Sequence, residues 1–339
     1  MSSSNAQYDV VIVGAGPAGM CAALYTGRAR LKTALLERGL PGGELLNTEH
    51  LDDVIGWPMI LGRDLAKAFI DHSLQFGAEL HQEETETVTR RADGIFETKC
   101  ASGAVYESPA VIVTAGGTPI KLGVPGELEY AGRGVTYCAT CDANFFVNET
   151  ICVVGGGDAA AEEADYLTRF ASKVYLIHRR DELRAAKIIQ ERLFANPKIE
   201  VIWDTVVEEI VGTPTKGMHG ARLRHRVTGE ERLLDVTGSF VFVGFKPNTG
   251  IINAHYRHDP SGYVITDAAM QTNIPGLFVA GDMRSQLTRQ VTTATGDATT
   301  AAVAVDKYLK AFRSGDPDAQ HAILGTIGQA TVSAGVGTV

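Results

Sequence analysis

One sequence pattern occurs twice in this chain and constrains its fold more than any other feature. An apolar, β-branched run is followed at once by a glycine-rich turn, a helical segment and a second apolar run. The first copy starts with residues 8–13 and the turn GAGPAG (14–19), the second with residues 151–154 and the turn GGGDAA (155–160). Such runs are typical of buried parallel strands. The repeat therefore predicts an α/β chain built from two parallel-sheet domains.

Each part of the repeat suits dinucleotide binding. The first glycines let the backbone turn tightly and approach a pyrophosphate, and the last small residue lets helix and strand pack closely. The N-terminus of the helix faces the phosphate charge. A lone turn of this form is weak evidence, but here both copies have the complete context. We therefore expect two Rossmann-like domains in a three-layer ββα arrangement, with cofactor contacts from Gly14, Gly16, Pro17, Ala18, Gly19, Gly155, Gly157, Asp158 and Ala160.

The residue that follows the second strand differs between the two copies. Glu37 and His178 each lie 23 residues after the first glycine of their turn. An acid there accepts hydrogen bonds from a ribose hydroxyl and repels a 2′-phosphate, which favours FAD or NAD at the first site. His178 is followed by Arg179, Arg180 and Arg184, and such a cluster can bind a 2′-phosphate. The second site is therefore predicted to prefer NADP(H).

The remaining apolar runs predict that one domain is inserted into the other. Runs at 111–113 and 277–279 fit the first domain, and a run at 240–243 fits the second. Prolines mark two crossings, near residues 118–119 and 246–248. The expected division is a discontinuous domain for FAD or NAD (1–119 and 247–313), a domain for NADP(H) that contains a cysteine pair (120–246) and a C-terminal extension of unknown role (314–339).

Composition and charge restrict the function classes. The 339 residues carry a net charge of −9, which argues against a nucleic acid or an anionic membrane as the main partner. Residues 1–7 lack the basic segment of a signal peptide, and no apolar stretch reaches the roughly 18 residues of a membrane helix. We expect a cytoplasmic protein, in which a disulfide is usually catalytic or regulatory.

Two cysteines, Cys138 and Cys141, precede the second glycine-rich turn and are followed by Asp142. Such a pair can close a reducible disulfide or form half of a zinc site. A structural zinc site usually needs four ligands, and the other three cysteines stand alone in the sequence. We therefore expect no metal, and a dithiol that exchanges electrons with a cofactor.

With these motifs in this order, the chain resembles the low-molecular-weight, bacterial-type thioredoxin reductases, which are flavoprotein pyridine nucleotide-disulfide oxidoreductases. The resemblance covers residues 8–312 and adds PGGEL (41–45), HRRD (178–181), Gly281-Asp282 and Arg289-Gln290 to the features above. It implies that electrons pass from NADPH through FAD and the Cys138–Cys141 disulfide to the disulfide of thioredoxin. It also implies a homodimer whose two domains alternate between two orientations.

The resemblance also implies roles for single residues. Cys141 is expected close to the flavin, Cys138 is expected to attack the partner disulfide, and Asp142 is expected to be the acid/base. The alternative for Asp142 is a helix N-cap. Further FAD contacts are expected from Gly42, Gly43, Glu44, Leu45, Asn47, Gly281, Asp282, Arg289 and Gln290.

The docking surface and two departures from the family pattern bear on the substrate. Phe145, Phe146 and Arg133 are candidates for the surface on which thioredoxin docks, although each phenylalanine could equally be a core residue. Residues 143–144 are Ala-Asn where Gly-Phe is more usual, which bears on the thioredoxin accepted. Glu44 stands where Gln is common, and a carboxylate near the flavin would lower its reduction potential.

Other function classes stay open at this point. A related flavin disulfide oxidoreductase with a different electron donor, or with a disulfide substrate other than thioredoxin, would not need the same basic cluster or docking surface. The flavin component of a peroxide-reducing system usually carries an additional N-terminal redox domain. A redox-sensing binding module would bind nucleotide without turnover, and would not need the dithiol together with both cofactor sites.

Overall fold

The structure is a computed structural model that describes residues 6–48, 50–51 and 53–315. These residues form two compact units. The first unit comprises the described residues up to Gly117 and those from Pro247 onward, and the second is the continuous segment Thr118–Lys246. At the boundary, strands β11 (Gly117–Pro119) and β20 (Phe245–Pro247) pair with each other. From residue 316 onward, the expected C-terminal extension lies outside the described residues.

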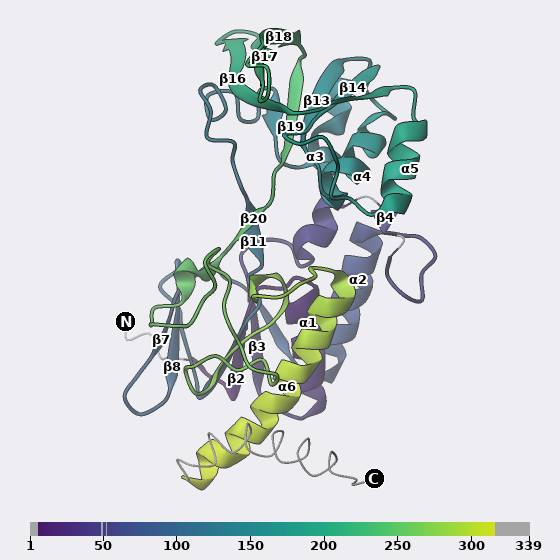
Figure 1. The fold of residues 1–339 in the computed structure, drawn as a ribbon. Helices are drawn as coiled ribbons and strands as arrows, with labels where there is room; N and C mark the ends of the chain where they lie inside the picture. Colours follow the sequence, from purple (N-terminus) through teal and green to yellow (C-terminus); the bar gives the residue numbers. More distant parts are fainter. Residues whose placement is uncertain (1–5, 49, 52, 316–339) are drawn as a thin grey trace, which may run out of the picture. The chain divides into compact units, whose positions relative to one another are not determined.

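A five-stranded parallel sheet, in the order β21-β10-β2-β3-β6, forms the centre of the first unit. Helices α1, α2 and α6 lie next to one another over one face (Figure 1), and a smaller sheet of β1, β9, β8 and β7 covers the other. The bounds are β1 Ala6–Gln7, β2 Val10–Val13, α1 Pro17–Arg28, β3 Thr33–Glu37, β4 His50–Leu51, β5 Ile60–Leu61, α2 Gly62–Ser73, β6 Glu79–Gln82, β7 Thr85–Arg90, β8 Phe96–Cys100, β9 Val105–Ser108, β10 Ala110–Val113, β21 Leu277–Val279 and α6 Val291–Ser314.

The second unit repeats this architecture. Its parallel sheet has the order β12-β19-β13-β14-β15, with helices α4 and α5 on one face and the antiparallel sheet β16-β17-β18 on the other. The bounds are β12 Val135–Thr136, α3 Ala139–Asp142, β13 Thr150–Gly155, α4 Asp158–Leu167, β14 Lys173–Ile177, α5 Lys187–Ala195, β15 Ile199–Ile202, β16 Thr205–Thr213, β17 Gly217–His225, β18 Glu231–Asp235 and β19 Gly238–Phe242.

Strand β2 shows why the central runs are apolar without interruption. Val10 and Ile12 pack into the core beneath the helices, whereas Val11 and Val13 pack into the core beneath the small sheet. Strand β13 divides its side chains between two cores in the same way. A strand that is covered on both faces has no polar side, because successive side chains point to opposite faces. The predicted α/β fold class with two Rossmann-like sheets is confirmed.

The helices after the glycine-rich turns begin earlier than the apolar pattern suggested. In the sequence, the helical patterns run from residue 20 to about residue 28 and from residue 162 to residue 169, whereas α1 starts at Pro17 and α4 starts at Asp158. Proline at the first helical position and an acid in the first turn both favour a helix start, so the turn leads directly into the helix.

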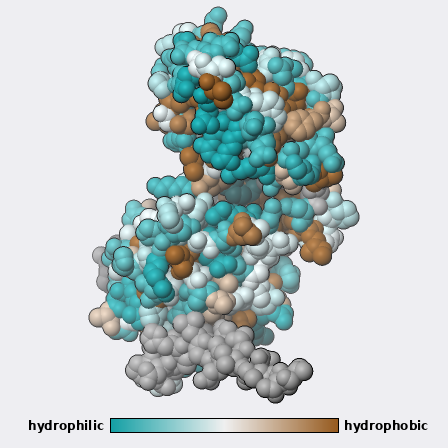
Figure 2. All heavy atoms as spheres, viewed as in Figure 1, coloured by the Kyte–Doolittle hydropathy of each residue, from teal (hydrophilic) through white to brown (hydrophobic). Residues whose placement is uncertain are grey.

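One face of each unit is mainly polar. Figure 2 shows hydrophilic residues over most of the visible face of each unit, with hydrophobic residues scattered among them. Within the described part of the chain, no helix is long and apolar enough to cross a membrane.

Candidate active site

The first glycine-rich turn closes tightly between β2 and α1. Gly14 has a φ of +98°, and a Cβ there would lie 2.6 Å from the Thr114 carbonyl oxygen. A Cβ on Gly19 would lie 1.8 Å from the carbonyl oxygen of Gly14. Gly14 is therefore needed for its backbone conformation, and Gly19 for the close approach of α1 to the turn.

Both turns leave an opening at the start of the helix that follows. The nearest atom to a Cβ on Gly16 would be the Gly43 Cα at 3.9 Å, and a Cβ on Gly157 would meet no atom within 4 Å. Gly16 and Gly157 are the N-caps of α1 and α4, and neither helix has a side-chain cap. The first N–H groups of a helix lack partners within it and carry partial positive charge. Each opening thus fits a dinucleotide pyrophosphate.

Glu37 ends β3 beside the first turn. Its carboxylate accepts hydrogen bonds from the backbone N–H groups of Ala15 (2.8 Å) and Gly39 (2.9 Å). Each carboxylate oxygen has a second lone pair, so Glu37 can still accept a hydrogen bond from a ribose hydroxyl. The acid therefore holds the turn in place as well as supplying the negative charge noted in the sequence.

Residues 42–47 lie against the same turn. The Gly42 N–H donates to the Ala15 carbonyl oxygen (2.8 Å). The Leu45 side chain is buried in the core beneath the helices, and the Asn47 amide donates to the Glu44 carboxylate (3.2 Å). Leu45 thus anchors a segment whose polar residues lie near the opening.

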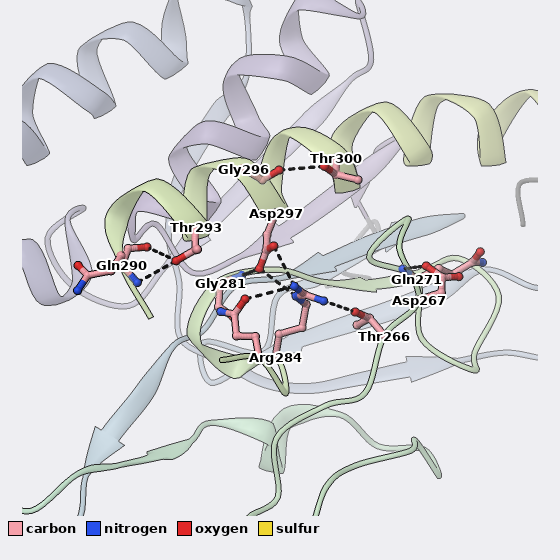
Figure 3. A network of polar contacts seen from close by, with 11 residues as sticks. Thr266, Asp267, Gln271, Gly281, Arg284, Gln290, Thr293, Gly296, Asp297 and Thr300 are labelled. Atoms are coloured by element: carbon pink, nitrogen blue, oxygen red, sulfur yellow. Dashed lines mark hydrogen bonds and ion pairs between the residues drawn. The ribbon is translucent and has the colours of Figure 1, made fainter. Parts of the chain in front are cut away.

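Helix α6 holds the turn at residues 281–282 (Figure 3). The Asp297 carboxylate accepts hydrogen bonds from the Gly281 N–H (3.2 Å) and, through both of its oxygens, from the Arg284 guanidinium (2.9 and 3.1 Å). A Cβ on Gly281 would lie 3.0 Å from the Ala18 Cβ, so this turn adjoins the start of α1. Arg284 and Asp297 were not predicted from the sequence, because the two residues belong to no recognisable motif.

Two carboxyl groups share this end of the sheet. Burial raises the pKa of Asp282; the opposite charge of Arg289 counteracts the rise and Asp297 adds to it. The surrounding protein also raises the pKa of Glu44, although this side chain still reaches solvent; the Asn47 hydrogen bond opposes the rise and Asp282 adds to it. Such carboxyl groups are suited to bind sugar hydroxyls.

The two residues before α6 are exposed. The Arg289 guanidinium lies 3.9 Å from the ring centroid of Tyr263. Gln290 caps α6 through a reciprocal capping box with Thr293 (Figure 3). The predicted FAD residues of the first unit therefore gather around the carboxyl ends of its parallel strands, where ligands bind in open α/β sheets.

His178 lies beneath the second glycine-rich turn, and not on the surface with the neighbouring arginines. Its Nδ1 is 2.8 Å from the Gly155 carbonyl oxygen, and a Cβ on Gly156 would lie 2.2 Å from its ring. Burial lowers the pKa of the imidazole, against the hydrogen bond to Gly155. His178 therefore does not belong to the exposed basic cluster that the sequence predicted. Its neutral imidazole ring packs beneath the turn and supports it.

Four arginines surround this turn on the exposed side. Arg179, Arg180 and Arg184 are exposed, and the Arg184 N–H donates to the turn itself (2.7 Å, to the Gly156 carbonyl oxygen). Arg226, in the turn after β17, donates to the Arg179 carbonyl oxygen (2.8 Å). Arg226 was not predicted from the sequence, because only the tertiary fold brings its turn beside residue 179.

Cys138 and Cys141 form a disulfide at the start of the short helix α3. Cys141 is exposed and Cys138 is partly buried, with the Cys141 N–H 3.2 Å from the Cys138 Sγ. The Asp142 carboxylate accepts a hydrogen bond from the Thr136 hydroxyl and makes no N-capping bond. Asp142 stands at the N-cap position of the 3₁₀ turn Ala143–Phe146, but its side chain makes no capping bond, and its carboxylate lies close to the disulfide in the chain.

The two phenylalanines after the cysteine pair face opposite ways. Phe145 is 79% exposed, whereas Phe146 is 8% exposed and packs edge-on against Phe240. Consecutive residues of a 3₁₀ turn point in different directions, so only one of the two reaches solvent. Phe146 is therefore a core residue, and Phe145 and the exposed Arg133 remain for a docking surface.

The other cysteines are not paired with each other. Burial raises the pKa of Cys100 to about 11 and that of Cys152 to about 12, so both are neutral thiols at neutral pH. Cys21 is partly buried in α1. Among the residues that the structure describes, no group of three or more His, Cys, Asp or Glu side chains could hold a metal ion.

Comparison with known proteins identifies relatives along most of the chain. Residues 8–298 match the family model "Pyridine nucleotide-disulphide oxidoreductase". The chain is 45% identical over 313 residues to the thioredoxin reductase of Listeria monocytogenes serovar 1/2a, covering 92% of this chain and 97% of that relative. The crystal structure of Lactococcus lactis thioredoxin reductase has a TM-score of 0.87 at 42% identity, covering 89% of this chain and 99% of that one. For T. acidophilum thioredoxin reductase the TM-score is 0.85 at 32% identity, with 90% and 99% covered.

Proposed function

The chain belongs to the thioredoxin reductases of the pyridine nucleotide-disulphide oxidoreductase family, and from this membership we propose that it reduces the disulfide of thioredoxin with electrons from NADPH, by way of FAD. One observation carries the proposal. The Cys138–Cys141 disulfide belongs to the same compact unit as the glycine-rich turn flanked by arginines. The other glycine-rich turn, beside Glu37, lies in the other unit. FAD, when bound, accepts a hydride and returns the electrons as a pair to a disulfide.

The first unit is the proposed FAD-binding domain. The N-terminus of α1 and the open space at Gly16 would hold the pyrophosphate, and Glu37 would accept a hydrogen bond from the adenosine ribose. Asp282 and Arg289 supply polar groups for the remainder of the cofactor. These groups follow the carboxyl ends of the parallel sheet of the first unit, which holds their backbone in place.

The second unit is the proposed NADPH-binding domain. The N-terminus of α4 and the open space at Gly157 would hold the pyrophosphate. Arg179, Arg180 and Arg184 would bind the 2′-phosphate, because exposed guanidinium groups form strong, paired hydrogen bonds with phosphate oxygens. This arrangement favours NADPH over NADH.

The cysteine pair and Asp142 carry out the exchange with the protein substrate. Reduction turns the Cys138–Cys141 disulfide into two thiols, with the uptake of two electrons and two protons. The Cys138 thiolate then attacks the thioredoxin disulfide, and Cys141 resolves the mixed disulfide, so that thioredoxin leaves with two thiols. Asp142 would exchange protons with this dithiol.

Turnover with purified protein tests the proposal. The protein should contain FAD and should oxidise NADPH far faster than NADH when oxidised thioredoxin is present. Cys138→Ser should abolish thioredoxin reduction while keeping FAD, whereas the control Cys21→Ser should leave turnover unchanged. Equal turnover with NADH would contradict the role of the arginines, and thioredoxin turnover by Cys138→Ser would contradict the dithiol mechanism.

The assembly and location are further parts of this proposal. By analogy with the family, we expect a cytoplasmic homodimer. Light scattering at micromolar concentration should give twice the 36.2 kDa chain mass. A monomer that turns over at the full rate would rule out a need for the dimer.

A further inference from the structure

Thr136 lies at the end of β12, and its hydroxyl forms hydrogen bonds with Cys138 and with Asp142, the two ends of the segment 138–142. Its side chain is buried, and its hydroxyl oxygen lies 3.2 Å from the Cys138 backbone nitrogen, whose N–H it accepts. The hydroxyl donates its own proton to Oδ2 of Asp142, since the other acceptor within reach, the Cys138 carbonyl oxygen, is 3.4 Å away and uncharged. A hydroxyl can accept and donate at the same time, so both bonds coexist.

No other described residue donates a hydrogen bond to the Asp142 side chain. One carboxylate oxygen is therefore held by Thr136, while the other has no hydrogen-bond donor among the described residues. A group that transfers protons needs this combination, because it must be fixed in position yet keep one oxygen free to exchange.

The backbone of Thr136 is itself held by the parallel sheet. Strand β12 pairs with β19, and Thr136 stands opposite Phe240, which is fully buried. The hydroxyl therefore extends from a rigid element toward a short helix at the surface. Removing the hydroxyl would leave the Asp142 side chain free to rotate.

We propose that Thr136 is the positioning residue for Asp142, a role that rests on the function proposed above. The hydroxyl holds the carboxylate in register with Cys138, through the N–H of that same cysteine. Thr136 touches neither sulfur in this scheme, and it acts only through Asp142 and the backbone. Interconversion of the disulfide and the dithiol moves two protons, and Thr136 orients the carboxyl group that would exchange them.

Two substitutions at this position separate the hydroxyl from the shape of the side chain. Thr136→Val keeps the shape and removes the hydroxyl, and should lower kcat for thioredoxin reduction about tenfold, with KM for NADPH unchanged. Thr136→Ser keeps the hydroxyl and should retain most of the activity. Equal activity of the valine and serine variants would overturn the proposal.

A double-mutant cycle with Asp142→Asn tests whether Thr136 acts through the carboxylate. In the Asp142→Asn background, Thr136→Val should cost less than about twofold, because the group that it positions is already absent. A purely structural effect would lower kcat by the same factor in both backgrounds, and that result would contradict the inference.

Thr168→Val is the matched control for lost stability. Thr168 is also buried in the second unit and also both donates (2.6 Å, to the Asp165 carbonyl oxygen) and accepts (3.0 Å, from the Asn196 amide), but it lies at the opposite end of α4 from the glycine-rich turn. Its variant should keep full activity. An equal fall in kcat in both variants would show a general loss of stability and would overturn the role of Thr136.

The test does not depend on thioredoxin being the substrate. If the wild-type protein fails to reduce thioredoxin, the proposed function fails. The same variants can then be compared by the rate at which free thiols appear on the protein itself, with NADPH as reductant and oxygen excluded. A slower rate in Thr136→Val, but not in Thr136→Ser, would still support the positioning role, and equal rates would contradict it.

Discussion

At the residue scale, two glycines of the second turn differ in what a methyl group would meet. A Cβ on Gly155 would lie 2.4 Å from the Phe242 carbonyl oxygen, whereas a Cβ on Gly157 would meet open space. Gly157→Ala should therefore fold normally but raise KM for NADPH roughly tenfold, because the methyl group fills the proposed pyrophosphate site. Gly155→Ala should instead lower the free energy of unfolding by about 1–3 kcal/mol. Steady-state kinetics and thermal unfolding of both variants distinguish the two effects.

The buried imidazole of His178 makes stability depend on pH. Its folded-state pKa lies below the ordinary value of 6.5, so the unfolded chain binds a proton more readily than the folded one. The contribution of the neutral imidazole to the free energy of unfolding is therefore fully present above about pH 6.5 and is lost as the pH falls through the folded-state pKa. His178→Asn keeps a donor near the Gly155 carbonyl oxygen and does not titrate. Urea midpoints between about pH 8 and pH 5 should fall less steeply in this variant; identical slopes would contradict the assignment.

Glu44 should lower the reduction potential of bound FAD, because a negative charge disfavours the reduced flavin. Glu44→Gln should therefore raise the potential by about 10–30 mV, where 30 mV corresponds to about 1.4 kcal/mol. The pKa of Glu44 is raised, so the difference from wild type should grow as the pH rises and the carboxyl ionises. A redox titration at several pH values measures it. The control Glu86→Gln, on the exposed side of β7, should leave the potential unchanged.

At the element scale, two ion pairs of helix α6 differ in how deeply they are buried. Asp297 pairs with Arg284, and both side chains are largely buried, whereas Asp306 pairs with Lys310 at the surface. Asp297→Asn leaves the Arg284 charge uncompensated and should lower the free energy of unfolding by about 3 kcal/mol, with loss of FAD on dilution. Asp306→Asn should cost less than about 1 kcal/mol. Thermal unfolding and flavin absorbance of the two variants test this difference.

The elements were predicted from sequence with uneven success. The central strands were found because burial on both faces makes them apolar throughout, as at residues 277–279, where the predicted run and β21 coincide. The starts of α1 and α4 were missed, because their first turns consist of small residues without an apolar pattern. The burial of Phe146 could not be predicted, since two adjacent phenylalanines in the sequence do not indicate which side chain is buried.

At the scale of the whole molecule, the second unit has cores made entirely of its own residues, on both faces of its sheet. The fragment 118–246 should therefore unfold cooperatively by itself and bind NADP⁺ without FAD. The first unit differs, because its core contains α6 and β21 from the far end of the chain. The fragment 6–117 should not fold alone. Circular dichroism during urea unfolding checks both fragments, and a structureless 118–246 would contradict the division.

Sequence alone determined what depends on neighbours along the chain. We could infer two strand–turn–helix units and the pairing of Cys138 with Cys141. We could also infer a preference for a free ribose at Glu37 and for a 2′-phosphate at the arginines after residue 178. Each of these rests on a few consecutive residues or a fixed spacing. Only the tertiary structure decided which distant side chains support them. Asp297 reaches the turn at 281–282, Arg226 joins Arg179, and Thr136 holds Asp142, because hydrogen bonds and burial depend on distance in space and leave no periodic signal in the chain.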